Sequence, residues 1–295
     1  MSFVTVMKKD FQDSARSRWL WGLTVLFVLF AGGAAYLYGA TDLFVSEGGT
    51  RTTQGFIGLL AGAAGLLVPV IALLAGHKAI VGERESGSLK LLLSLPHTRR
   101  DAVVGKFIGR TGVVTASILI GFLVATVLGV ALFGQFDPVE FIAFTGITVL
   151  LAFAYISISM GLSAATASAS RAAAIAFGFW LVFEFLWGLI GFVLLWATNG
   201  FSLGGIGDGG LPEWYFLFLR LSPSAAYSAG VQALFEGQSI INTVTFGGTT
   251  ATSNPLGEGA TIPFFLEDWF AFVILVIWVV VPVTLGYLRF ESTDL

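Results

Sequence analysis

Long apolar runs alternate with short polar stretches along most of the chain. Six of the runs are long enough for an α-helix to cross about 30 Å of hydrocarbon. They lie near residues 19–40, 56–78, 103–133, 139–163, 172–197 and 268–289. Each run is continuously apolar, whereas a β-barrel strand would alternate apolar and polar residues. The pattern therefore predicts an all-α integral membrane protein with six transmembrane helices.

Composition agrees with this pattern and limits the classes of function. Of the 295 residues, 56% are hydrophobic and 11% are charged, with a mean hydropathy of +0.88, whereas soluble domains carry roughly 25% charged residues. We therefore expect a single transmembrane domain over residues 1–295. The chain has no cysteine, which excludes disulfide bonds, thiolate metal sites and a cysteine nucleophile.

Basic residues are divided unevenly between the two sides of the predicted membrane domain. Arg51 and Arg220 fall on one side, and the other thirteen of the fifteen Lys and Arg residues fall on the opposite side. Positive residues concentrate in cytoplasmic loops. The distribution thus predicts a multi-pass protein of the cell (cytoplasmic) membrane with both termini in the cytoplasm.

The N-terminal stretch, residues 1–18, has the period of a helix. Its apolar positions are Phe3, Met7, Phe11 and Ala15, and the opposite face carries Lys8, Lys9, Gln12 and Arg16. This spacing predicts an amphipathic helix that lies in the cytoplasmic interface and leads into the first span. The alternative is a frayed basic terminus.

Residues 199–266 separate the fifth and sixth spans on the outer side. A Gly-rich stretch is followed by the apolar segment YFLFLRLSPSAAYSAGVQALFEG, which Pro223 divides into two parts too short to span a bilayer. We expect a pair of short interfacial or re-entrant helices in this extracytoplasmic segment.

The most polar internal stretch, residues 81–101, is predicted to be a cytoplasmic hairpin between the second and third spans. Ser86 is expected to cap a helix through GSLKLLLSL that ends at Pro96, and Thr98 with Asp101 forms a capping box for the next helix. The leucines at 89, 92 and 93 share one helical face, with charged residues around them. Such a surface suits a soluble partner; alternatively, the leucines fold onto the membrane interface and the charges only set the topology.

The sequence GERESGSLKLLLSLPHTRRDAVVGKFIGR resembles the cytoplasmic loop of ABC-2 type transporter permeases, in particular the NosY-like branch. The acidic-Arg-acidic-Ser-Gly core, the Leu-Leu-x-Leu-Pro run, the Arg-rich turn and the following Gly-Lys all match. The six spans, the N-terminal helix and the apolar outer segment are similar to the same family. The resemblance thus extends, less closely, over the whole chain.

The resemblance implies a permease subunit of an ABC transporter, of a family that mostly exports its substrates. Residues 3–18 correspond to the connecting helix of the family. The hairpin corresponds to the coupling helix, which sits in a cleft of a separate ATP-binding subunit; the matching residues are Glu83, Arg84, Glu85, Ser86, Gly87, Leu89, Leu92 and Leu93. The implied assembly contains two permease copies, or one copy and a close paralogue, in the lipid bilayer, with ATP and Mg on the partner subunit and no nucleic acid.

The chain itself has no recognisable enzymatic site. It contains no GxxxxGK[ST] stretch, since the Gly105–Phe107 sequence lacks both the preceding Gly and the following Ser or Thr that bind phosphates. His77 and His97 have no second ligand at metal spacing. We therefore expect neither an ATPase site nor a metal or other cofactor bound by this chain.

Glu184 lies near the middle of the fifth apolar run. Placing a carboxyl group at that depth of a bilayer costs free energy, so the side chain should face protein or water rather than lipid. It is a candidate pathway or gating residue, or else a protonated hydrogen-bond donor to a neighbouring helix. The alternative function for the whole chain is an ATP-independent channel or a proton-coupled carrier that uses Glu184.

Overall fold

The computed structural model describes residues 3–16, 18–41, 43–44, 50–88, 98–202, 211–235, 245–246, 249–250 and 261–292. The long helices are α2 (Arg18–Ala40), α3 (Thr53–Gly76), α6 (Arg99–Leu132), α7 (Pro138–Ala165) and α12 (Asp268–Glu291). A further long helical segment consists of α8 (Ala169–Leu181), the π-helix η1 (Val182–Leu186) and α9 (Trp187–Thr198). The short elements are α1 (Phe3–Ala15), α4 (Val81–Glu85), α10 (Glu213–Arg220), α11 (Pro223–Gln232), the 3-10 helix η3 (Phe264–Leu266) and the antiparallel pair β1 (Thr245–Phe246) and β2 (Thr249–Thr250).

The six predicted spans are confirmed. Six helical segments of the described chain are long and apolar enough to cross a membrane: Trp21–Ala40, Thr53–Glu85, Arg99–Leu132, Pro138–Ala165, Ala169–Thr198 and Asp268–Glu291. The hydrophobic pattern located them because helix length and apolarity are local properties of a sequence. The predicted all-α membrane fold is therefore correct.

Two helix starts show how local chemistry sets the boundaries. Thr98 Oγ1 accepts a hydrogen bond from the N–H of Asp101, and the carboxylate of Asp101 accepts one from the N–H of Thr98, both at 3.1 Å. This is the predicted capping box. Asp137 caps α7, since its Oδ1 accepts hydrogen bonds from the N–H groups of Val139 and Glu140. Pro138 follows at the first helical position, where its missing N–H costs nothing.

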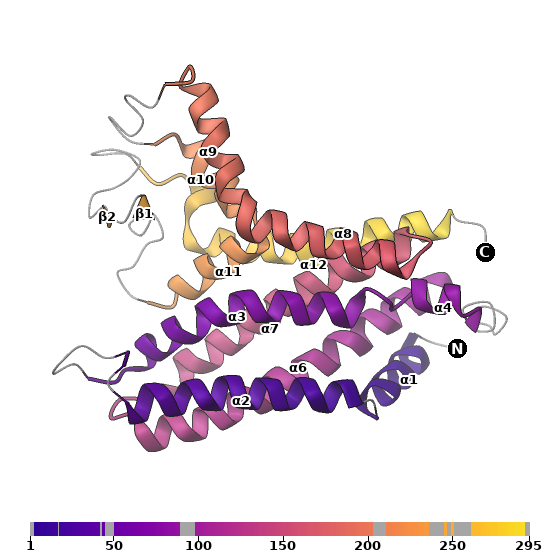
Figure 1. Cartoon of the computed structure of the whole chain (residues 1–295), viewed down its shortest axis with the longest axis horizontal. Helices are drawn as coiled ribbons and strands as arrows, with labels where there is room; N and C mark the ends of the chain where they lie inside the picture. The colour runs from indigo at the N-terminus through magenta and orange to yellow at the C-terminus, as the bar shows by residue number, and fades with distance from the viewer. Residues whose placement is uncertain are drawn as a thin grey trace. The chain divides into compact units, whose positions relative to one another are not determined.

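The chain forms two compact units, one of residues 1–178 and 277–295 and the other of residues 179–276. In the first unit, α2 lies along α6, α6 along α7 and α7 along α3 (Figure 1). An aromatic cluster fills one end of this bundle, with neighbouring ring centroids 5.1 to 5.7 Å apart; its members are Tyr38, Phe56, Phe122, Phe133, Phe141 and Phe144. Such edge and stacked contacts add to the burial of the rings.

The helix α1 packs along α6 by a face that includes Val6 and Asp10. A Cβ atom at Gly105 would lie 2.7 Å from Cβ of Val6, and one at Gly109 would lie 2.8 Å from Oδ2 of Asp10. The two glycines thus permit the close approach of α1. Phe3 and Phe11 of the predicted apolar face stay 39% exposed, and their insertion into a membrane interface remains a prediction.

In the second unit, the two short helices expected around Pro223 are α10 and α11. Arg220 at the end of α10 is buried and donates hydrogen bonds to the carbonyl groups of Phe265 and Glu267, at 3.3 and 2.8 Å. The indole of Trp187 stacks on the ring of Phe218 at 4.3 Å, and its Nε1–H donates to the Phe218 carbonyl at 2.8 Å. These contacts tie α9, α10 and η3 together.

Candidate functional site

The predicted coupling hairpin, residues 81–101, is described at its two ends. Val81–Glu85 form α4, which follows α3 after a four-residue turn, and α6 begins at Arg99. Leu89, Leu92 and Leu93 lie outside the described residues, as does Pro96. We call residues 77–88 the stem; they comprise the four-residue turn and the first described end of the hairpin.

The predicted role of Ser86 as the N-terminal cap of the next helix is wrong. Ser86 is the C-terminal cap of α4, with its N–H bonded to the carbonyl of Gly82 and its Oγ–H donated to the carbonyl of Glu83 at 3.2 Å. Gly87 follows with φ of 75°, a left-handed conformation that favours glycine and ends helices. The physical reason is that helical geometry continues from α3 through the turn to Glu85, so Ser86 ends a helix that the sequence pattern did not predict.

Glu83 forms an ion pair with Lys106 of α6. The Nζ atom of Lys106 lies 2.7 Å from Oε1 of Glu83, and it also donates a 2.7 Å hydrogen bond to the carbonyl of Ala79. The Lys106 side chain is 5% exposed, and that of Glu83 is 34% exposed. Because an unpaired buried ammonium group is costly, these two partners hold the lysine in place and attach the stem to α6.

A second ion pair lies one helical turn further along α6. Arg110 Nε is 3.1 Å from Oδ2 of Asp10 in α1, and Arg110 Nη1–H donates to the carbonyl of Ala75 at 3.3 Å. Burial raises the pKa of Asp10, while the charges of Arg110 and Lys106 oppose that shift. Lys106 and Arg110 therefore connect α6 to α1, to α4 and to the end of α3.

The stem is also bound to α7 and α8. The Oγ atom of Ser163 near the end of α7 accepts hydrogen bonds from the N–H groups of Ile80 and Val81, both at 3.1 Å. Glu85 Oε1 accepts a 2.8 Å hydrogen bond from the N–H of Ala169, the first residue of α8. A carboxylate at this end of a helix satisfies a free N–H group and complements the helix dipole. The side chain of Val81 packs beside Ala169 in a small buried cluster.

Several of these contacts were missed by the sequence reasoning, which treated Lys106 and Arg110 as charges that set topology. The available signal was their spacing, since residues four apart lie on the same helical face, at the start of an otherwise apolar helix. Asp10 and Ser163 gave no comparable signal. Their partners lie far away in the sequence, and only the packing of α1 and α7 brings them together.

Glu184 lies in the π-helical segment η1, within the second unit. Its Oε2 accepts a 2.6 Å hydrogen bond from the hydroxyl of Ser224 in α11. The neighbouring Ser222 donates from Oγ to the carbonyl of Phe183 at 3.3 Å. Single turns of π-helix occur often at functional sites. The carboxyl group is half-buried and faces a polar protein partner, as its position in an apolar run requires.

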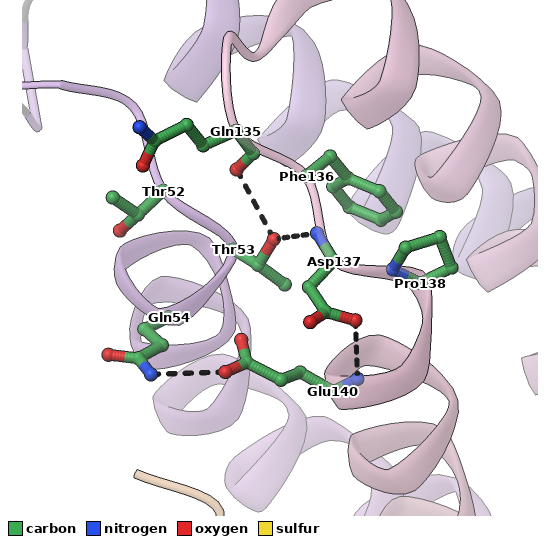
Figure 2. Close-up of a pocket in the computed structure, with 8 residues that line it drawn as sticks. All are labelled: Thr52, Thr53, Gln54, Gln135, Phe136, Asp137, Pro138 and Glu140. Carbon is green, nitrogen blue, oxygen red and sulfur yellow. Dashed lines mark hydrogen bonds between the residues drawn. The ribbon is translucent and has the colours of Figure 1, made fainter. Parts of the chain in front are cut away.

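A polar pocket of about 540 Å³ lies at the end of the first unit where α3 starts and α6 ends, lined by residues 52–54, 135–138 and 140. Figure 2 shows Thr53 Oγ1 between the carbonyl of Gln135 and the N–H of Asp137, donating to the first and accepting from the second. Gln54 Nε2 donates to Glu140 Oε1 at 3.1 Å. These polar groups bind one another and fasten α3 to the α6–α7 connection.

The fold and the hairpin sequence together define a transporter permease, and comparison with known proteins agrees. The family model described as ABC-2 family transporter protein matches residues 4–295. The chain belongs to this family and is the permease subunit of an ABC transporter, a role that implies an ATP-binding partner. The resemblance inferred from the hairpin is thus confirmed.

Two relatives carry the name Probable ABC transporter permease protein NosY. The one from Stutzerimonas stutzeri is 31% identical over 300 residues, which cover 97% of this chain and 96% of that protein. The one from Pseudomonas aeruginosa is 32% identical over 200 residues, which cover 66% of this chain and 72% of that protein. The similarity to the first of them extends over all six spans and the hairpin.

Proposed function

We propose that the chain is the permease of an exporter, in which closure of a separate ATP-binding subunit moves the hairpin and thereby the transmembrane helices. The observation that carries the proposal is the attachment of the hairpin stem to three different long helices: α6 through Lys106, α7 through Ser163 and α8 through Ala169. A force applied to such a stem reaches much of the membrane domain at once.

The hairpin, residues 81–101, is the proposed docking element for the ATP-binding subunit. Within it, the resemblance to the family assigns the docking region to the sequence from Glu83 to Gly87 and the leucines at 89, 92 and 93. An apolar group of leucines surrounded by charge is suited to a cleft in a soluble partner. The chain then supplies no ATPase site, and ATP with Mg binds to the partner.

Co-purification tests this assignment. The full-length permease is expressed with a candidate ATP-binding subunit, extracted in detergent and tested for a stable complex and for ATPase activity. Leu92→Asp is expected to abolish the complex. Leu43→Asp, at a leucine that is 74% exposed in the α2–α3 connection, is the matched control and should leave the complex intact. Failure of the unmodified chain to bind any ATP-binding subunit would instead favour an ATP-independent carrier.

The orientation and oligomeric state follow from the same proposal. Thirteen of the fifteen Lys and Arg residues lie on the hairpin side, which favours a cytoplasmic hairpin and cytoplasmic termini in the cell membrane. Two permease copies, identical or paralogous, would present two hairpins to two ATP-binding subunits. Reporter fusions at both termini test the orientation, and cross-linking of differently tagged copies tests the dimer.

Glu184 is the proposed gating residue. Its hydrogen bond to Ser224 joins the π-helical segment of the fifth span to α11, so a change in that bond would shift α11 relative to the span. The π-helix supports this role because single π-helical turns within α-helices occur often at functional sites. Transport by Glu184→Gln at the unmodified rate across a range of pH values would make the carboxyl group structural.

A further inference from the structure

The two acidic residues of α4 both bind groups of their own chain. Glu83 pairs with Lys106 Nζ at 2.7 Å, and Glu85 accepts from the N–H of Ala169 at 2.8 Å. We propose that Glu83 and Glu85, although they lie in the region that the family resemblance assigns to docking, are positioning residues that transmit hairpin movement to α6 and α8. The leucines at 89, 92 and 93 then hold the ATP-binding subunit. This inference rests on the proposed function and assigns separate tasks within the same element.

Lys106 is the receiving group on α6. Its Nζ atom binds both Glu83 in α4 and the carbonyl of Ala79 in the preceding turn, so a single buried cation is attached to two points of the stem. Water cannot readily replace these partners, because the side chain is 5% exposed. A displacement of α4 must therefore carry the start of α6 with it or leave a buried charge unpaired.

The transmitted movement extends from α6 to α1. Arg110 lies one turn after Lys106 on the same face of α6 and pairs with Asp10 of α1 at 3.1 Å. The close packing of α1 on Gly105 and Gly109 adds a direct contact between the two helices beside this ion pair. The stem, the first turns of α6 and α1 are thus expected to move as one body.

Glu85 makes the corresponding connection to α8. Its carboxylate binds the first N–H of a helix whose N-terminal end carries partial positive charge, and the buried contact of Val81 with Ala169 and Ala172 supports it. The α8 helix continues directly into the π-helical segment that holds Glu184. Movement of Glu85 therefore reaches the fifth span at its start.

Hydrogen–deuterium exchange of the complete transporter tests the two connections separately. The full-length permease is assembled with its ATP-binding subunit in lipid nanodiscs, and exchange is compared with and without ATP, Mg and vanadate. In the unmodified complex, nucleotide should change exchange in residues 99–110 of α6 and 169–178 of α8. Lys106→Met should lose the change in α6 and keep that in α8, whereas Glu85→Arg should lose the change in α8 and keep that in α6.

Conservative variants separate transmission from a general loss of folding. Lys106→Arg keeps a cation and Glu85→Gln keeps an acceptor oxygen, so both are expected to retain the nucleotide-dependent changes. Lys78→Met removes an exposed lysine from the same turn and serves as the control for Lys106→Met. The proposal is supported if these three variants keep the nucleotide-dependent changes in exchange while Lys106→Met and Glu85→Arg each lose one of them.

Two results would overturn the inference. If Glu83→Gln or Glu85→Arg releases the ATP-binding subunit, these carboxylates dock rather than transmit. If both variants and Lys106→Met keep every nucleotide-dependent change, the connections are merely structural. An unmodified permease that binds no ATP-binding subunit would instead refute the proposed function, a result that co-purification detects before any exchange experiment.

Discussion

Lys106 of α6 and Glu83 of α4 form an ion pair of 2.7 Å in which the lysine side chain is almost fully buried. The pair joins the element that the sequence assigns to an ATP-binding partner to a helix of the membrane domain. An ion pair of this kind contributes little net stability compared with an apolar contact, but removal of one partner is costly. Its value lies in fixing the position of one element against the other.

Replacement of the lysine is expected to lower the stability of the membrane domain. Lys106→Met leaves Glu83 and the carbonyl of Ala79 without their common donor. Because Glu83 is half-buried and water can reach it, the free energy of unfolding should fall by only roughly 1–3 kcal/mol. Thermal unfolding in detergent, followed by tryptophan fluorescence, measures the effect. Lys78→Met should unfold at the temperature of the unmodified chain, and an equal loss in both variants would contradict a specific role for the pair.

The contact between α7 and α12 depends on two glycines. A Cβ atom added at Gly161 would collide with the carbonyl of Pro282, and one added at Gly286 would collide with the backbone of Gly161. Because backbone cannot yield as a flexible side chain does, Gly161→Ala should destabilise the protein by roughly 1–3 kcal/mol.

Gly146 provides the control within the same helix. A Cβ atom there meets nothing within 4 Å, so Gly146→Ala should be neutral or stabilise α7 by up to about 1 kcal/mol. Melting temperatures of the two variants in the same detergent decide the comparison. Similar melting temperatures for the two variants would show that α7 and α12 do not pack closely enough to exclude a methyl group at Gly161.

Asp10 should titrate at a higher pH than a free aspartate. Burial raises its pKa above 3.8, against the opposing effects of Arg110 and Lys106. The folded state then binds the proton more tightly than the unfolded chain does. The docking of α1 therefore gains stability as the pH falls through the raised pKa of folded Asp10 towards the pKa of the unfolded chain, and it loses this stability as the pH rises again. Carbon-detected NMR of the labelled carboxyl group measures the titration, and Arg110→Gln should move it further upward. A downward shift in that variant would contradict the assigned pair.

Arg220 should be essential for the order of the second unit around η3. It is 5% exposed, donates to the carbonyls of Phe265 and Glu267 and lies 3.8 Å from Asp268 Oδ1. Arg220→Gln removes bonds from a charged donor, at a cost of about 2 kcal/mol, and should increase hydrogen exchange in residues 261–268. Glu213→Gln, at the exposed start of the same helix, should not.

Glu184→Gln should leave assembly with the ATP-binding subunit intact. The amide oxygen of glutamine can still accept from Ser224, whereas Ser224→Val removes the donor and leaves the carboxyl group without that bond. The melting temperature should therefore fall more for Ser224→Val than for Glu184→Gln. Co-purification and thermal unfolding test both statements, and a dissociated Glu184→Gln complex would show that the residue supports assembly.

Much of the architecture could be predicted because it depends on neighbouring residues. The six apolar runs determine the six spans, since each run alone is long enough to cross hydrocarbon. The capping box of Thr98 with Asp101 is likewise contained in four consecutive residues. The hairpin sequence, also contiguous, was sufficient to indicate the ABC-2 family.

Tertiary structure decided which polar groups meet. Lys106, Arg110 and Asp10 each look like exposed charges in the sequence, and only the packing of α1, α4 and α6 turns them into partly buried ion pairs. In the same way, the position of α8 gives Glu85 an N–H group to bind, and α11 gives Glu184 its serine. The physical reason is that a polar group in an apolar environment must find a partner, while the identity of that partner depends on how distant segments fold together.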